Sequence, residues 1–219
     1  MSEVKTIAIL TSGGDAPGMN AAVRAATIVA HALGIKTYGI SRGYRGLLEE
    51  QISELSPELV DSVFREGGTM LHSTRCLEFH EVGVRDTARE ILAKWAIDGL
   101  IVIGGNGSLA GALALSDPKE AGDKAPQVIG IPASIDNDIG LTGMSIGVDT
   151  AMNTIVEACD KISDTASAHD RTFIVEVMGR DCGYLAMTAG IASGADLVLF
   201  PEAHRPAEEI VEAAVKAVM

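Results

Sequence analysis

Short runs of apolar residues alternate with helix-like patterns along the whole chain. A short apolar run between glycines or polar residues is typical of a buried strand, and apolar residues three or four apart predict a helix. The predicted strands cover 6–11, 35–40, 99–103, 127–131, 172–178 and 196–200. The predicted helices cover 19–33, 57–65, 85–96, 148–163 and 183–192, with one more ending at Leu115 and a last one starting at Pro206. Strands that are apolar throughout and separated by helices predict an α/β fold, with a mainly parallel sheet covered by helices on both faces.

Breaks in this pattern indicate where the fold divides. Segment 117–126 is polar and is predicted to be a surface loop inside one domain. Glycines cluster over 139–147, so the predicted domains are 1–142 and 143–219. The helix that starts at Pro206 reaches Met219 without a C-terminal capping signal, so we expect the chain to be a fragment of a longer architecture.

Composition narrows the classes of function. The 219 residues are 47% hydrophobic, which is ample for a buried core. The net charge of −13 and the lack of a basic run argue against a nucleic-acid partner, although a local arginine cluster still permits an anionic substrate. Cys76, Cys159 and Cys182 are too scattered for a metal site and fit a reducing cytosol. Without a signal peptide or an apolar run of membrane-spanning length, we expect a cytoplasmic protein with no membrane partner.

Two glycine-rich loops follow predicted strands and precede predicted helices. Residues 13–18 read GGDAPG, and residues 104–108 read GGNGS. Glycines let the backbone approach a phosphate, and a helix N-terminus offers free N–H groups and a positive dipole end. The first loop alone fits a tight structural turn equally well, and it matches neither the P-loop nor the GxGxxG pattern. Two such loops at the carboxyl edge of one parallel sheet favour an anion site.

Charged residues follow two further predicted strands. Asp136 and Asp138 follow the fourth strand, and such a pair can divide the work, one taking a proton from a hydroxyl and the other holding a metal ion. An acidic surface turn is the alternative, but the same predicted sheet edge favours function. Arg180 ends the fifth strand, where it can clamp a phosphate or stabilise charge in a transition state. Arg171 and Arg75 are further cationic candidates, although an isolated arginine is usually a solvated surface residue.

Six motifs, in this order, resemble the 6-phosphofructokinase family. They read ILTSGGDAPGMNAAVRA, GYRGLL, GGTMLHSTR, IGGNGSLAGA, PASIDNDI and DTASAHDRTFIVEVMGRDCGYLA, and together they span nearly the whole chain. The resemblance implies the phosphofructokinase fold, a parallel β-sheet sandwiched by helices in two Rossmann-like domains, the second incomplete in this chain. It also implies that 1–142 is the main part of a nucleotide-binding domain and that 143–219 is part of a sugar-phosphate-binding domain.

The resemblance implies a glycolytic kinase that phosphorylates fructose 6-phosphate to fructose 1,6-bisphosphate with ATP and Mg²⁺. Asn106 and Asp138 would hold the metal, directly or through water. Phosphoryl transfer depends on positioning and charge neutralisation, which such a set can supply. The implied nucleotide contacts are Gly13, Tyr44, Arg75, Cys76, Gly105, Asn106, Gly107 and Ser108.

On the acceptor side, the resemblance implies that Asp136 deprotonates the sugar 1-hydroxyl. Ser134 would help to bind the sugar phosphate or the transferred group, and Arg180 would stabilise the transition state. Arg171 would reach the site of a neighbouring subunit, in a homotetramer or a dimer. The implied sugar-phosphate contacts are Ser134, Asp136, Arg171, Met178, Gly179, Arg180 and Glu202.

The sequence departs from the family pattern at three site positions. Asn106 stands where many relatives have Asp, which should weaken direct Mg²⁺ binding. Ser134 keeps the hydroxyl of the usual Thr. Ala133 stands where many relatives have Gly and pyrophosphate-dependent relatives typically carry Lys; those relatives also often have Asp at the position of Gly107. Small residues at 107 and 133 leave room for a nucleotide α-phosphate and therefore favour ATP.

The effector site of bacterial relatives is matched only in part. Arg24 matches one basic effector residue, and Asp196 matches an acidic ligand of the effector metal. Ile28 and Ser163 stand where those relatives have Arg. We therefore expect an impaired or altered effector site.

Three other functions stay open at this point. A pyrophosphate-dependent phosphofructokinase is the first, and Gly107 with Ala133 argues against it. A non-catalytic relative that binds sugar phosphate or nucleotide is the second. Asn106 and the short chain favour it, whereas the retained Asp136, Asp138 and Arg180 argue against it. A nicotinamide-dependent dehydrogenase is the third, but the chain lacks the GxGxxG loop that such enzymes need.

Overall fold

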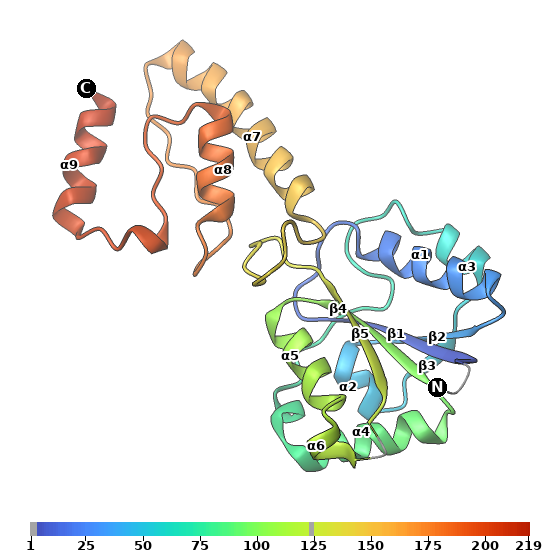
Figure 1. Ribbon diagram of the computed structural model, residues 1–219. Coiled ribbons are helices and arrows are strands. Elements are labelled where there is room, and N and C mark those ends of the chain that lie inside the picture. Colours follow the sequence, from blue (N-terminus) through green and yellow to red (C-terminus); the bar gives the residue numbers. More distant parts are fainter. Residues whose placement is uncertain (1–3, 123–124) are drawn as a thin grey trace. The chain divides into compact units, whose positions relative to one another are not determined.

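The computed structural model describes residues 4–122 and 125–219 and divides into two compact units (Figure 1). The first, here named the sheet unit, is Met1–Ser134, and the second, the helical unit, is Ile135–Met219. The division falls earlier than the domain boundary expected between residues 142 and 143. The roles expected for the two domains stay predictions.

A five-stranded sheet forms the centre of the sheet unit. Its strand order is β3-β2-β1-β4-β5. Neighbouring strands are parallel except for the pair β2 and β3, which is antiparallel. The predicted, mainly parallel sheet flanked by helices is therefore confirmed, with one antiparallel edge strand added. The strands are β1 (Thr6–Ser12), β2 (Lys36–Ile40), β3 (Ile52–Glu54), β4 (Gly99–Gly104) and β5 (Gln127–Pro132).

Helices lie on both faces of this sheet, with α1 and α3 on one face and α2, α4 and α5 on the other (Figure 1). Side chains alternate between the faces of a strand. Ala8 and Leu10 of β1 therefore join Leu100 and Val102 of β4 in one buried core with the second group of helices. The helices are α1 (Met19–Ala32), α2 (Gly43–Leu48), α3 (Pro57–Asp61), α4 (Val82–Lys94), α5 (Asn106–Leu115) and α6 (Pro118–Ala121), with a short 3-10 helix η1 (Leu77–His80).

Two local predictions in the sheet unit were wrong. The helix expected over 57–65 ends at Asp61. The loop expected over 117–126 contains α6, because Asp117 accepts a hydrogen bond from the Lys119 backbone N–H at 2.9 Å and Pro118 suits the first helical position. Residues 123 and 124 of that expected loop lie outside the described residues. The short elements α2, β3 and η1 were not predicted.

The helical unit contains α7 (Val148–His169), α8 (Tyr184–Ser193), a 3-10 helix η3 (Pro201–Ala203) and α9 (Ala207–Val218). Helices α7 and α8 pack together, and Leu185 and Ala189 of α8 are buried. Helix α7 continues beyond the predicted end at residue 163, up to a left-handed C-cap at Asp170.

The strands predicted over 172–178 and 196–200 are not formed, so this part of the prediction was wrong. A strand needs a partner for its backbone N–H and C=O groups, and none pairs with either segment among the described residues. Ile174, in the middle of one segment, is 98% exposed. In the part of the chain that the structure describes, no helix combines the length and apolar character needed to cross a membrane.

Candidate functional site

The two glycine-rich loops meet at the point where the strand order of the sheet reverses, between β1 and β4. Strands β1 and β4 are neighbours; the chain goes from β1 outward to β2 on one side and from β4 outward to β5 on the other. Ligands of parallel α/β sheets bind beyond the carboxyl ends of the strands at such a point. Gly13 follows β1 and Gly105 follows β4, so the structure brings the two predicted loops together.

Close packing between these loops requires glycine. Gly13 has φ +91°, and a Cβ there would lie 3.3 Å from Ser108 Oγ. A Cβ on Gly104 would lie 2.9 Å from Ser108 Cβ and would overlap the Ser12 carbonyl oxygen. The Ser73 hydroxyl donates a hydrogen bond to the Gly13 carbonyl. Gly13 and Gly104 therefore cannot be replaced by larger residues without displacing Ser108 or Ser12.

The N-terminus of α5 can attract an anion. Gly105 is its N-cap and, within the described residues, provides no side-chain cap. Asn106 and Gly107 are exposed in the first turn, whereas Ser108 is buried. The N–H groups of a first helical turn and the positive end of the helix dipole favour a negatively charged group at this position.

Three other residues expected near the nucleotide differ in exposure. Tyr44 is buried, stacks on Phe79 with ring centroids 3.9 Å apart, and donates a hydrogen bond from its hydroxyl to the Ser108 carbonyl at 2.7 Å. Burial strongly raises the pKa of the Tyr44 hydroxyl. Cys76 is half-buried, and burial followed by the Glu78 charge raises the pKa of its thiol. Arg75 is exposed. Their contacts with a nucleotide stay predictions.

Ser134 ends the sheet unit beside the second glycine loop. The Ala133 backbone N–H donates to the Gly104 carbonyl at 2.9 Å, which extends the β4–β5 pairing. A Cβ on Gly105 would lie 3.7 Å from Ser134 Cβ. The sheet unit therefore brings Ser134 close to the anion-attracting loop.

Asp136 combines a buried carboxylate oxygen with a raised pKa. Its Oδ1 is buried and has no hydrogen-bond partner among the described residues. Burial raises the pKa of the Asp136 carboxyl; the charges of Asp138 and Asp181 raise it further, while Arg180 lowers it. A carboxylate with a raised pKa and an unused acceptor atom is a candidate proton acceptor.

A tight turn holds the backbone around Asp136. The Cys182 thiol donates a hydrogen bond to the Asp136 carbonyl at 3.1 Å. Gly179 opens this turn with φ +106°, and a Cβ there would overlap the Cys182 carbonyl and approach Asp136 Oδ1 to 4.0 Å. Gly179 is therefore required by its positive φ and by the close approach of the Cys182 carbonyl within this turn.

The remaining predicted acceptor residues of the helical unit are more open. The Arg180 side chain is 92% exposed, and its guanidinium donates to the Asp181 carboxylate at 3.1 Å. Glu202 has another partner, because its carboxylate accepts hydrogen bonds from the Gly183 backbone N–H at 2.8 and 3.0 Å, and these bonds lower its pKa. The other predicted site residues of this unit are exposed: Asp138, Arg171, Met178 and Asp196.

The predicted effector residue Arg24 lies on α1. Its guanidinium forms an ion pair with Asp61 and lies over the Phe64 ring, 4.7 Å from the ring centroid. The structure thus gives Arg24 two partners from its own unit.

Sequence reasoning missed Ser73, Phe79 and Asp181. Ser73 and Asp181 stand inside motifs that carry the resemblance and Phe79 lies just beyond one, but none was assigned a role. Ser73 and Phe79 contact the glycine-rich loop residues or their neighbours only through residues far apart in sequence, and no local pattern signals such contacts. Asp181 could have been found as the acidic neighbour of Arg180.

Oxygen ligands suit Mg²⁺, which often binds one or two carboxylates while substrate phosphates and waters complete its shell. Among the described residues, no three His, Cys, Asp or Glu side chains are grouped to hold a metal without such help. The predicted ligands Asn106 and Asp138 both offer oxygen atoms, and the negative charges of Asp138 and Asp181 that act on Asp136 favour a cation near this carboxylate. The donor chemistry therefore fits Mg²⁺ that arrives with a phosphate ligand.

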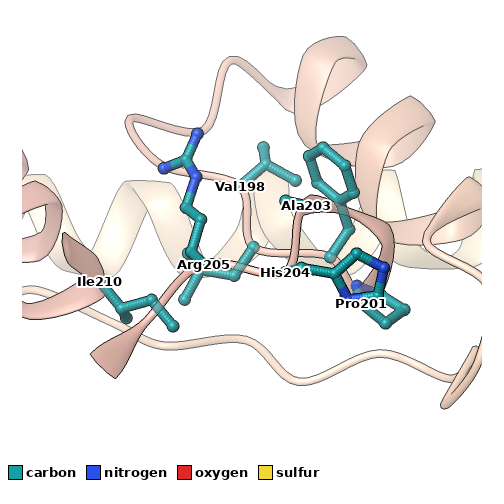
Figure 2. A pocket seen from close by; sticks show the side chains of 8 residues that line it. Val198, Pro201, Ala203, His204, Arg205 and Ile210 are labelled. Atoms are coloured by element: carbon teal, nitrogen blue, oxygen red, sulfur yellow. The ribbon is translucent and has the colours of Figure 1, made fainter. Parts of the chain in front are cut away.

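A small cavity in the helical unit contains none of the predicted site residues. Its volume is about 190 Å³. Figure 2 shows its lining, which includes Val198, Ala203, His204, Arg205 and Ile210. The predicted site residues lie outside it.

Comparisons with known proteins agree on one family. The family profile described as Phosphofructokinase matches residues 6–218. The chain is 52% identical over 209 residues to an ATP-dependent 6-phosphofructokinase of Staphylococcus epidermidis, with 95% of this chain and 64% of the relative covered. It is 53% identical over 207 residues to one of Clostridioides difficile, with 94% of this chain and 63% of the relative covered. The chain thus spans just under two thirds of the length of these curated relatives.

Solved structures show the same architecture. Phosphofructokinase from Saccharomyces cerevisiae is 37% identical with a TM-score of 0.86, and the match covers 97% of this chain and 32% of that one. A pyrophosphate-dependent phosphofructokinase from Marinobacter aquaeolei has a TM-score of 0.84 at 24% identity over 98% of this chain and 57% of that one, a likeness of fold alone. The paired glycine loops, the constrained Asp136 and the match over residues 6–218 lead to one conclusion: the chain belongs to the phosphofructokinase family.

Proposed function

We propose that this chain carries the donor-binding and catalytic parts of an ATP-dependent 6-phosphofructokinase, which converts fructose 6-phosphate to fructose 1,6-bisphosphate. The observation that carries the proposal is the Asp136 carboxylate, whose buried Oδ1 has no hydrogen-bond partner among the described residues. The identity of 52–53% to relatives named ATP-dependent 6-phosphofructokinase supports the donor and the acceptor.

Asp136 acts as the general base in this proposal. An unpaired carboxylate oxygen can accept the proton of the sugar 1-hydroxyl as that hydroxyl attacks phosphorus. A carboxylate whose pKa is raised by burial is a stronger base than an ordinary aspartate. The Cys182 thiol holds the backbone of this residue and so limits the positions of its carboxylate.

The donor phosphates are held by the backbone in this proposal. Gly13, Gly105 and Gly107 leave space close to the backbone, and the α5 N-terminus supplies N–H groups and a positive dipole end. A Cβ at Gly107 would meet no atom within 4 Å, so there is open room beside this residue. This room supports a nucleotide, with its bulky α-phosphate and ribose, over pyrophosphate.

Mg²⁺ would be held by Asn106 and Asp138, and when bound it supplies charge neutralisation on the transferring phosphoryl group. In this proposal the exposed Arg180 guanidinium exchanges Asp181 for a substrate phosphate. In the same proposal Ser134, Met178 and Gly179 contact the acceptor, and Arg171 serves a neighbouring subunit of a homo-oligomer. Glu202 would have to release Gly183 to reach a sugar phosphate.

The proposal places the protein in the cytoplasm, where glycolytic kinases meet their substrates. It also keeps the expectation of an altered effector site. Support for that comes from Arg24, because its guanidinium is already paired with Asp61 and stacked on Phe64. An effector phosphate would have to compete with both contacts.

A coupled assay for fructose 1,6-bisphosphate tests this proposal. It is run on the chain and on its longest native form, with Mg²⁺ and either ATP or pyrophosphate. We expect turnover with ATP and a loss of about 10²- to 10⁴-fold in kcat for Asp136→Asn, the usual contribution of a general base. The matched control is Asp160→Asn, an exposed aspartate on α7 that should leave kcat unchanged. Turnover with pyrophosphate alone would contradict ATP as the phosphoryl donor. Full activity of Asp136→Asn would contradict Asp136 as the general base.

A further inference from the structure

A buried cluster of charges in the sheet unit has no part in the proposed chemistry. Arg85 and Arg89 of α4 are only 7% and 3% exposed. Arg85 donates to both carboxylate oxygens of Glu120 on α6, at 2.7 and 2.6 Å, and Arg89 donates to the same carboxylate at 2.8 Å. A bidentate arginine–carboxylate pair fixes geometry as well as charge. Both arginines are therefore held in defined orientations.

Arg89 connects this cluster to the C-terminus of α5. Its guanidinium donates to the Leu115 carbonyl at 3.0 Å and to the Ala114 carbonyl at 2.9 Å. The last carbonyls of a helix have no partner within the helix, and a cation there also complements the negative end of the dipole. One end of α5 is thus anchored to α4.

Arg85 connects the cluster to the N-terminus of α5 in three steps. Its guanidinium donates to the Phe79 carbonyl at 2.8 Å. The Phe79 ring stacks on Tyr44 with an angle of 20° between the ring planes. Tyr44 in turn donates to the Ser108 carbonyl at 2.7 Å, within the first turn of α5.

The stacked rings lie directly against α5. A Cβ on Gly111 would be 3.2 Å from Tyr44 and 3.3 Å from Phe79. Beside the stack, Arg45 and Glu78 form an ion pair at 2.5 Å that joins the same two segments. With contacts this close, a displacement of Phe79 or Tyr44 has to be transmitted to the helix whose first turn carries Asn106, Gly107 and Ser108.

We infer that Arg85 and Glu120 are positioning residues for the donor-phosphate loop, acting through Phe79 and Tyr44 on the first turn of α5. The inference rests on the proposed function for the identity of the ligand, a magnesium nucleoside triphosphate. A buried ion pair is in general weak support for stability, because the cost of removing two charges from water offsets their attraction. Its defined contacts to Phe79 and to α5 point instead to a geometric role.

Glu120→Gln tests this inference, because it removes the charge and keeps the shape. The readouts in the longest native form are the Kd of a non-hydrolysable ATP analogue with Mg²⁺, measured by calorimetry, and the KM values of both substrates. We expect the analogue Kd and the KM for ATP to rise about five- to tenfold, as for coupled residues in one contact network, with little change in the KM for fructose 6-phosphate. If Glu120→Gln does not fold, Arg85→Lys replaces it, because lysine keeps the positive charge but cannot donate two parallel hydrogen bonds to the Glu120 carboxylate.

Tyr44→Phe tests the last step, because it keeps the ring stack and removes only the hydrogen bond to Ser108. It should show the same selective loss of nucleotide affinity. In the double variant with Glu120→Gln, the loss should be smaller than the product of the single effects, since both changes interrupt one path. If the loss of affinity in the double variant equals the product of the two single losses, Glu120 and Tyr44 act independently and the inference is wrong.

Glu50→Gln is the matched control, because the Glu50 carboxylate pairs with Lys94 at 2.7 Å and accepts from Trp95 at 3.0 Å, both at the other end of α4, and makes no side-chain hydrogen bond to α5 among the described residues. Its analogue Kd should equal that of the wild type. A lower Tm for Glu120→Gln with an unchanged Kd would show a structural role alone and overturn the inference. A wild type that binds the analogue but forms no bisphosphate would contradict the proposed function and leave this inference standing, whereas a wild type that does not bind it would contradict both.

Discussion

Similar apolar segments form a buried strand in the sheet unit and an exposed irregular segment in the helical unit. In the sheet unit, β1 lies between β2 and β4, and Ile9 is fully buried. In the helical unit, the comparable run 172–178 has no partner strand among the described residues, and Ile174 is almost fully exposed. An apolar run therefore encodes a strand only where a second strand can pair with it.

The largest difference in the free energy of unfolding should be between alanine variants at Ile9 and at Ile174. Ile9→Ala removes a fully buried side chain and should lower the free energy of unfolding by about 2–5 kcal/mol. Ile174→Ala removes an exposed side chain and should change it by less than about 0.5 kcal/mol. Urea unfolding monitored by circular dichroism measures both. A large cost at Ile174 would show that this side chain is covered in solution and would remove the contrast between the units.

Two glycines give a second, smaller contrast. Gly104→Ala places a Cβ against the backbone of Ser12 and should cost about 1–3 kcal/mol, because that backbone belongs to β1 and cannot yield. Gly190→Ala on α8 meets mainly the Val198 side chain, which can change rotamer, and it gains up to about 1 kcal/mol of helix propensity. Chemical unfolding should therefore show a clear loss for the first variant and a change near zero for the second. Equal losses would mean that the helical unit packs as rigidly as the sheet.

Two carboxylates, one in each unit, should respond to pH in opposite directions. Hydrogen bonds from Arg85 and Arg89 lower the pKa of Glu120 to about 2, from 4.5. The stabilisation linked to its ionised form is therefore fully present above pH 4.5 and is lost as the pH falls toward 2. Glu120→Gln should lower the Tm at pH 7, and the difference from the wild type should shrink between pH 4.5 and 2 in a calorimetric series. A constant difference across that range would exclude this linkage.

Asp136 should give the smallest effect, with the opposite sign. Its raised pKa, caused first by burial, means that the folded chain binds a proton more tightly than the unfolded chain, so ionisation at neutral pH costs stability. Asp136→Asn should then raise the Tm at pH 7 slightly, because the residue is only half-buried and solvent screens part of the effect. The gain should vanish below the ordinary pKa of 3.8, where the carboxyl is protonated in both states. A lower Tm at pH 7 would show that the carboxylate has a stabilising partner.

The sequence was most informative where structure depends on neighbours in the chain. The apolar runs at 6–11 and 99–103 and the glycines after them predicted β1, β4 and the paired loops, because strand periodicity and turn chemistry are local. It failed for 172–178, since pairing is decided by another segment. It also could not show that Glu202 holds the Gly183 backbone N–H, or that Tyr44 is buried beneath Ser108, because these contacts join residues far apart in the chain.

The two edges of the sheet have unequal consequences for the association of the protein with other chains. Strand β3 offers only 3 residues at one edge, and the charged Glu54 there is paired with Lys36 at 3.0 Å. Strand β5 offers 6 residues at the other, with Ile129 exposed. Long apolar edges invite unwanted pairing with another chain, whereas short charged edges discourage it. If this chain aggregates through its sheet, we therefore expect another chain to pair with β5 rather than with β3.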